Sequence, residues 1–176
     1  MRSNFLFSLI LICLFSCSPK SDKELTILSK RLQNVKYEFE QVDKTKITQI
    51  HENYIYQSKM VKRCIDSVES KFNLYYSQYR TIKKVVPRFF EVYKISKENI
   101  KVQEEQLINL KYDIKNQLIK NDTTSFFLKL ESDNIDHIEK GVNELLKIYN
   151  YVNVNNDTLY DYIYQITEKY CDKNEK

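Results

Sequence analysis

A single glycine, Gly141, in a chain of 176 residues limits what this sequence can fold into. Tight β-hairpin turns need residues with positive φ, a conformation that glycine adopts most readily. Phosphate-binding loops, dinucleotide-binding fingerprints and nucleophile elbows each need glycines at fixed spacings. The sequence therefore argues against a fold rich in hairpins and excludes these three kinds of site. We predict no catalytic residue and no cofactor.

Apolar residues recur at alternating spacings of three and four, the pattern of an amphipathic helix with one buried face. Asp22 is predicted to cap the first helix, which would start near Lys23. Residues 43–46 interrupt the pattern, and we expect a break or a skip there. The apolar positions of this first helix are Leu25, Leu28, Leu32, Val35, Phe39 and Val42.

The apolar pattern resumes at Ile47 and continues to Val86, with Gln57 on the buried face and one stutter between Val68 and Phe72. Stutters change a supercoil locally without ending the helix. This stretch is therefore expected to be one long helix. Pro87 lacks a backbone N–H, so we expect it to end or kink that helix.

Two polar stretches are predicted to be loops between the later helices. Residues 121–124 form the clearest one, followed by a helix that Thr124 or Ser125 would cap. Residues 153–156 form the second, with Asp157 capping a last helix. A 40-residue helix is about 60 Å long. The fold class is therefore predicted as all-α, an elongated helical bundle or long antiparallel helical hairpin with coiled-coil-like seams.

The first residues have the composition of an export signal. Arg2 precedes an apolar run of eleven residues, 5–15, and polar residues follow at once. A membrane-spanning helix needs about 20 apolar residues. The run is too short to span a bilayer and is typical of the core of a secretory signal peptide.

Leu14-Phe15-Ser16-Cys17 closes this run, and it resembles the lipobox of bacterial lipoproteins. Phe15 departs from the strictest form of the box and is similar to the looser boxes of Bacteroidota and spirochaete lipoproteins. The resemblance implies cleavage before Cys17 and a diacylglycerol, with palmitate-type acyl chains, on its sulfur. Ser18 is not the Asp that resembles an inner-membrane retention signal, so we expect anchoring in the outer membrane of the cell envelope, on either face. The alternative is an ordinary signal peptide beside a chance cysteine.

These features divide the chain into a signal peptide over 1–16, a lipidated tether over 17–21, a single helical domain over 22–171 and a polar tail over 172–176. Loss of Arg2 with the signal leaves 27 basic and 24 acidic residues, a net charge of +3. That charge is too small to indicate a nucleic-acid partner.

Cys64 and Cys171 are the cysteines left once Cys13 departs with the signal and Cys17 takes the lipid. An exported protein lies in a compartment that permits disulfides. Two alternatives stay open, a disulfide between them or two buried, unpaired thiols. A disulfide would require the last helix to fold back along the middle of the long one.

A basic cluster surrounds Pro87, and it comprises Arg80, Lys83, Lys84 and Arg88. It would contact anionic headgroups, lipopolysaccharide or an acidic partner, or else form a solvated helix face.

His51 and His137 are the only histidines, and neither has an acidic residue three positions before it, as a helical di-metal site would need. We therefore predict no metal site.

The leading functional hypothesis is a non-enzymatic, lipid-anchored helical protein of the cell envelope that binds another macromolecule, with a protein as its expected partner. The alternative is a module that binds a ligand or a toxin, such as an immunity or inhibitor lipoprotein. A third hypothesis, an envelope enzyme, has no motif in its favour.

Overall fold

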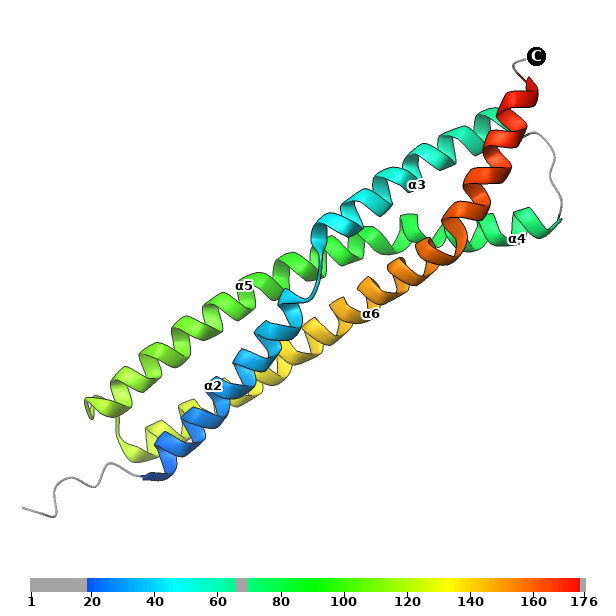
Figure 1. Ribbon diagram of the computed structural model, residues 1–176. Helices are drawn as coiled ribbons and strands as arrows, with labels where there is room; N and C mark the ends of the chain where they lie inside the picture. Colours follow the sequence, from blue (N-terminus) through cyan, green and yellow to red (C-terminus); the bar gives the residue numbers. More distant parts are fainter. Residues whose placement is uncertain (1–18, 66–69, 175–176) are drawn as a thin grey trace, which may run out of the picture. The chain divides into compact units, whose positions relative to one another are not determined.

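The computed structural model describes residues 19–65 and 70–174, and every regular element in that part of the chain is an α-helix. The all-α helical bundle is therefore confirmed. The helices are α2 (Pro19–Glu40), α3 (Lys44–Cys64), α4 (Ser70–Tyr79), α5 (Thr81–Lys115) and α6 (Asn121–Asn174) (Figure 1). They form two compact units. Unit 1 holds residues 19–34 and 100–137, and unit 2 holds the remaining described residues.

Unit 1 packs the first part of α2, the last part of α5 and the start of α6 around one apolar core. Gln103 on α5 contacts Glu131 on α6, so these two helices run antiparallel. Arg31 on α2 donates a hydrogen bond to Asp136 on α6 over 2.5 Å. The core residues of this unit are Leu25, Leu28, Leu32, Ile100, Leu107, Leu110, Ile114, Leu128 and Ile135.

Unit 2 packs α3 and α4 with the first part of α5 and the longer part of α6. Phe72 on α4 lies beside Tyr162, whereas Phe89 on α5 lies beside Tyr149, so α4 and α5 run antiparallel to α6. Figure 1 shows α3 running in the same direction as the last part of α6. The fully buried side chains of this unit include Ile47, Tyr79, Ile82, Val86, Phe89, Val142, Leu145, Val152 and Ile163.

The predicted apolar face of the first helix is confirmed, because all six of its apolar residues are buried. The break after it is also confirmed, since α2 ends at Glu40 and α3 begins at Lys44. Asp43 caps α3 by accepting a hydrogen bond from the Lys46 backbone N–H. The predicted start was wrong: α2 begins at Pro19, and Asp22 lies inside its first turns. Residues 19–21 of the predicted tether are therefore helical.

The single long helix predicted from Ile47 to Val86 was also wrong. The α3 helix ends at Cys64, and α4 and α5 are separate helices that meet at Arg80. The stutter in the apolar pattern therefore marks a change of helix. Val68 lies outside the described residues.

Pro87 neither ends a helix nor marks a turn between helices, because it lies inside α5. Proline inside a helix leaves the carbonyl four residues earlier without its N–H partner. That carbonyl belongs to Lys83, and both Lys83 and Pro87 are exposed. Solvent can therefore satisfy the carbonyl, while buried Val86 and Phe89 hold the helix in the core.

The loop predicted at 121–124 lies a few residues earlier, over 116–120, and α6 begins at Asn121. Neither Thr124 nor Ser125 is a cap, because the Thr124 N–H already bonds to the Lys120 carbonyl over 2.8 Å. Polar residues are common both in loops and in the first turn of a helix, which explains the error.

The α5 helix ends in a Schellman motif, in which Leu118 N–H bonds to the Asp113 carbonyl and Gln117 N–H to the Ile114 carbonyl. Gln117 has a φ of 54° in this motif. That left-handed position is usually taken by glycine.

The loop predicted at 153–156 and the Asp157 cap were wrong too, because α6 is continuous over 54 residues. The side-chain amides of Asn153 and Asn155 bond back to the carbonyls of Tyr149 and Tyr151, both over 2.9 Å. Buried Val152 and Leu159 keep the segment helical by packing, which outweighs the low helix propensity of asparagine. The helix continues through residues 172–174 of the predicted tail.

Candidate functional site

The predicted lipidation residue, Cys17, lies outside the described residues, as does the whole predicted signal peptide. The first described residue is Pro19, two positions further on, where α2 begins. Lipidation of Cys17 therefore stays a prediction. Among the described helices, none combines the length and the apolar character that crossing a membrane requires.

Cys64 and Cys171 form a disulfide with their Cα atoms 4.9 Å apart, so the structure selects the first of the two alternatives. Both residues are almost fully buried. The bridge ties the last residue of α3 to the final turns of α6. The expectation that it would join α6 to the middle of a long helix was wrong, because α3 ends at Cys64. These two sulfurs hold unit 2 together and are not free thiols.

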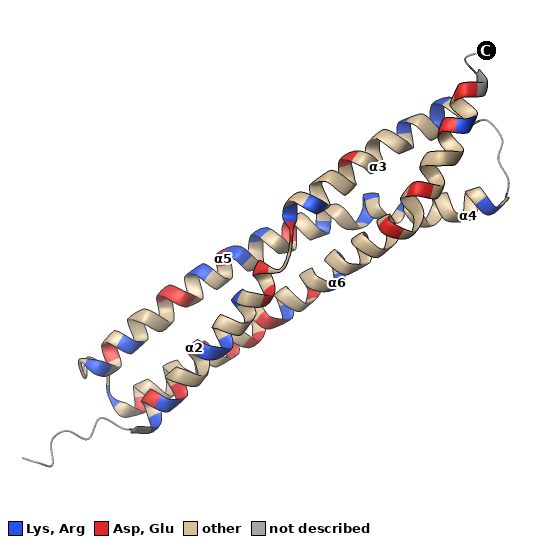
Figure 2. Ribbon diagram, viewed as in Figure 1, with Lys and Arg blue, Asp and Glu red and all other residues tan. Residues whose placement is uncertain are grey.

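The basic cluster around Pro87 does not present four equivalent charges. Arg88 donates hydrogen bonds to Glu144 over 2.8 Å and to Glu91 over 3.0 Å. Both hydrogen bonds raise the pKa of Arg88 above its usual value, and the bond to Glu144 has the larger effect. Arg80, Lys83 and Lys84 are exposed. Figure 2 shows acidic and basic residues interspersed along the helices. Contact of this cluster with an anionic partner stays a prediction.

The two histidines are far apart in the sequence and differ in environment. His51 is half-buried on α3, and His137 is exposed on α6. Within residues 19–65 and 70–174, no three His, Cys, Asp or Glu side chains come together in a way that could hold a metal ion.

A buried polar pair in unit 1 was not predicted. Gln103 Nε2 donates a hydrogen bond to Glu131 Oε2 over 2.5 Å, and Asn134 Nδ2 donates a longer one to the same oxygen over 3.4 Å. Gln103 and Glu131 are 2% and 7% exposed. Both side chains lie on the core-facing sides of their helices, so the pair fixes the register of α5 against α6 in this unit.

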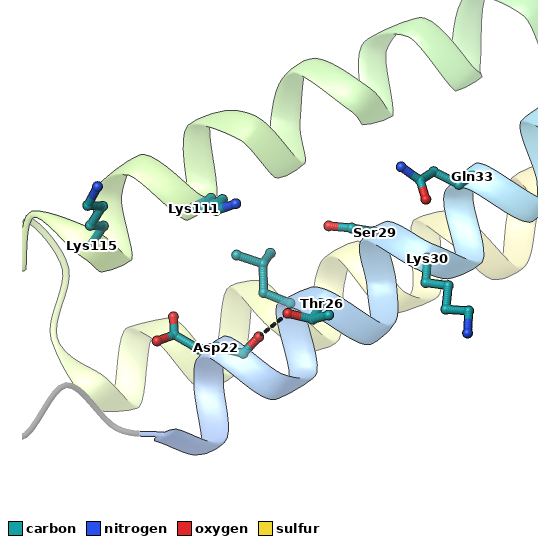
Figure 3. A pocket seen from close by; sticks show the side chains of 8 residues that line it. Asp22, Thr26, Ser29, Lys30, Gln33, Lys111 and Lys115 are labelled. Atoms are coloured by element: carbon teal, nitrogen blue, oxygen red, sulfur yellow. Dashed lines mark hydrogen bonds between the residues drawn. The ribbon is translucent and has the colours of Figure 1, made fainter.

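An open cleft of about 810 Å³ lies in unit 1 between α2 and α5. Figure 3 shows Ser29 and Gln33 of α2 pointing toward α5, whereas Lys30 points away from it. Hydroxyl, amide, carboxylate and ammonium groups line this cleft together with apolar surface. Its lining residues are Asp22, Leu25, Thr26, Ser29, Lys30, Gln33, Lys111 and Lys115. The sequence did not indicate it, because residues 22–33 and 111–115 are distant along the chain.

A group of three tyrosines, called the tyrosine surface below, lies on unit 2 and comprises Tyr56, Tyr160 and Tyr164. The rings of Tyr160 and Tyr164 stack with centroids 6.0 Å apart, and both are half-buried. Tyr56 on α3 is 57% exposed. Tyr164 donates a hydrogen bond to Glu168. That bond is the main cause of the raised pKa of Tyr164, to which burial, Glu168, Tyr160 and Tyr56 also contribute.

The tyrosines near the end of the chain are prominent in the sequence, but nothing in the spacing of residues indicated that Tyr56 would join them. The electrostatic interaction of Tyr56 with Tyr164 depends on how α3 packs beside α6, which the disulfide about two turns further along α3 ties together.

Comparison of this chain with protein-family models, with curated proteins and with solved structures found no match.

Proposed function

We propose that the mature chain is a non-enzymatic, lipid-anchored helical protein of the bacterial cell envelope that acts by binding another macromolecule, expected to be a protein. The tyrosine surface on unit 2 is the observation that carries the binding part of this proposal. Tyrosine is enriched in the cores of protein interfaces, because its ring supplies apolar area and its hydroxyl a hydrogen bond.

Two observations support the proposed compartment. The disulfide between Cys64 and Cys171 is consistent with a domain outside the cytoplasm, since disulfides persist in oxidising compartments. The apolar run ends in a lipobox-like sequence. This resemblance is the basis for proposing a lipid on Cys17 and attachment to a membrane. Two or three acyl chains hold a protein on a bilayer durably, whereas one chain holds it only reversibly.

Site-specific photo-crosslinking in the native host tests the binding role. A benzophenone amino acid would replace Tyr56, and in a control it would replace Tyr37, which is 66% exposed and belongs to the same unit. We expect a discrete, light-dependent adduct from position 56 and none from position 37. Adding Tyr160→Ser and Tyr164→Ser should remove the adduct. No adduct from position 56, or the same adducts from both positions, would contradict the proposed role of this surface.

A second candidate function is the binding of a ligand or a toxin segment, and the cleft in unit 1 favours it. Ser29 points into the cleft, so Ser29→Trp should fill part of it and abolish such binding. The tyrosine-surface variant should leave it unchanged. A cross-link at position 56 that persists in Ser29→Trp would assign the partner to the tyrosine surface.

A further inference from the structure

One end of unit 1 brings together three chain segments. A small cavity lies between the start of α2, at residues 20–24, and the start of α6, at residues 121–128. The connection over 116–120 leads directly into that start of α6. Pro19, where α2 begins, therefore lies at the same end of the unit as this connection (Figure 1).

Two large apolar side chains are exposed at this end, Leu118 in the connection and Phe126 in the first turns of α6. They are 62% and 64% exposed. Leu118 occupies the position of the Schellman motif whose apolar side chain usually packs back on the helix, and here most of that side chain remains exposed. Phe126 touches Phe127 edge-on, with ring centroids 5.6 Å apart, and still remains mostly exposed.

Lysines flank these two side chains. Lys115 closes α5 and Lys120 precedes α6, and both are exposed. Long basic side chains place their charge in the headgroup layer while their methylene stems cover apolar surface. Acidic residues also lie at this end, Asp22 on α2 and Asp122 on α6, so charge alone does not select its partner.

The covalent chain sets how far this end can lie from Cys17. Two extended residues span at most about 7 Å. Cys17 is two positions before Pro19. A lipid on Cys17 therefore brings the start of α2, and with it this end of unit 1, to the surface of the bilayer.

We propose that Leu118, Phe126 and the flanking Lys115 and Lys120, called the end surface below, rest on the bilayer that holds the Cys17 lipid. The two apolar side chains enter the boundary between headgroups and acyl chains, and the lysines lie among the headgroups. This inference rests on the proposed lipid attachment. Because apolar burial is its main driving force and the charges at this end nearly balance, the contact should be little affected by salt.

A tryptophan reporter tests the contact, since the chain contains no tryptophan of its own. The mature chain from Cys17 onward would be coupled to phosphatidylcholine vesicles that carry a maleimide headgroup lipid. Cys17 is then the only free thiol, because Cys64 and Cys171 are bridged. Chemical coupling makes this test independent of natural acylation, so its failure is distinct from failure of the proposed lipid anchor.

The reporters are Leu118→Trp and, separately, Phe126→Trp, and the control is Val154→Trp, which replaces a residue of unit 2 with 64% exposure. With brominated acyl chains in the vesicles, we expect quenching of both reporters to be several-fold stronger than quenching of the control. The result should persist at high salt. Unquenched reporters would overturn the inference. Equal quenching of all three positions would also overturn it, because it would mean that the bilayer contact is not confined to the end surface.

Discussion

Cys64 and Cys171 are separated by 107 positions in the sequence, and the disulfide between them brings their Cα atoms to 4.9 Å. The bridge joins the end of α3 to the last turns of α6 inside unit 2. It encloses α4, α5 and nearly all of α6 in one covalent loop. The tyrosine surface lies on the same two helices that the bridge connects, so the disulfide supports the geometry of the proposed binding site.

Replacing both cysteines with serine should lower the free energy of unfolding. A closed loop of about 100 residues is worth up to about 4–5 kcal/mol in the chain-entropy model, less any strain in the native bridge. Denaturant titration of the wild type and of Cys64→Ser/Cys171→Ser measures the difference, with reduced wild-type protein as the matched control. Thiols would also be counted in unreduced, denatured protein from the native host. Two titratable thiols in addition to any thiol at Cys17 would contradict the bridge.

Gly141→Ala should stabilise unit 2. Glycine inside a helix is less favourable than alanine by about 1 kcal/mol. A Cβ atom at this position would meet the Ser96 Oγ at 3.5 Å, an ordinary van der Waals distance. We expect the free energy of unfolding to rise by about 0.5–1 kcal/mol, measured by denaturant titration. Gly141→Val places a larger side chain at this position and serves as a control for the space available there. A destabilised alanine variant would contradict the packing described here.

Gln117→Gly should stabilise the end of α5. Gln117 is the non-glycine residue with positive φ among the described residues, at 54°. The left-handed conformation costs a residue with a Cβ about 1 kcal/mol of free energy, whereas glycine adopts it without that cost. The expected gain is about 1 kcal/mol in the free energy of unfolding, whereas Gln117→Ala should change it little. Equal stabilities of the glycine and alanine variants would contradict the assigned motif.

Tyr79→Phe should leave the protein folded and make it more stable by about 1 kcal/mol at neutral pH. The Tyr79 side chain is fully buried, and its hydroxyl has no hydrogen-bond partner in the part of the chain that the structure describes. Burial, and then the neighbouring Tyr160, Tyr54 and Tyr76, raise the pKa of this hydroxyl above its usual value.

That shift also predicts how the difference depends on pH. Above about pH 10 an unfolded tyrosine loses its proton, while folded Tyr79 keeps it. The unfolded state then binds fewer protons than the folded state, so the stability of the wild type falls as pH rises. Tyr79→Phe lacks this contribution, and its advantage should grow between about pH 9 and pH 11. Urea titrations at both pH values measure it, and a constant difference would contradict the buried, protonated hydroxyl.

The apolar faces of the helices could be predicted from the sequence because they depend on local spacing. All the apolar positions predicted for α2 are buried, and even Gln57, a polar residue on the predicted face of α3, is 2% exposed. Helix ends were harder to predict. Pro87 and Asn153 have properties that favour a break, yet packing of Val86, Phe89 and Val152 keeps both segments helical.

The contacts that define the candidate sites could not be predicted in the same way. Spacing along the chain does not say which helix packs against which, so the Gln103–Glu131 pair and the approach of Tyr56 to Tyr164 had no signal in the sequence. The disulfide was one of two open alternatives for the same reason. The cleft between α2 and α5 likewise depends on the packing of distant segments.

Metabolic labelling with a palmitate analogue tests the central claim, the lipid on Cys17, most directly. The label would be given to the native host expressing either the wild type or Cys17→Ala, with Cys13→Ala as a matched control inside the predicted signal. We predict that the wild type and Cys13→Ala take up the label, whereas Cys17→Ala takes up none and accumulates as uncleaved precursor. Equal labelling of Cys17→Ala, or an unlabelled wild type, would contradict the lipid anchor.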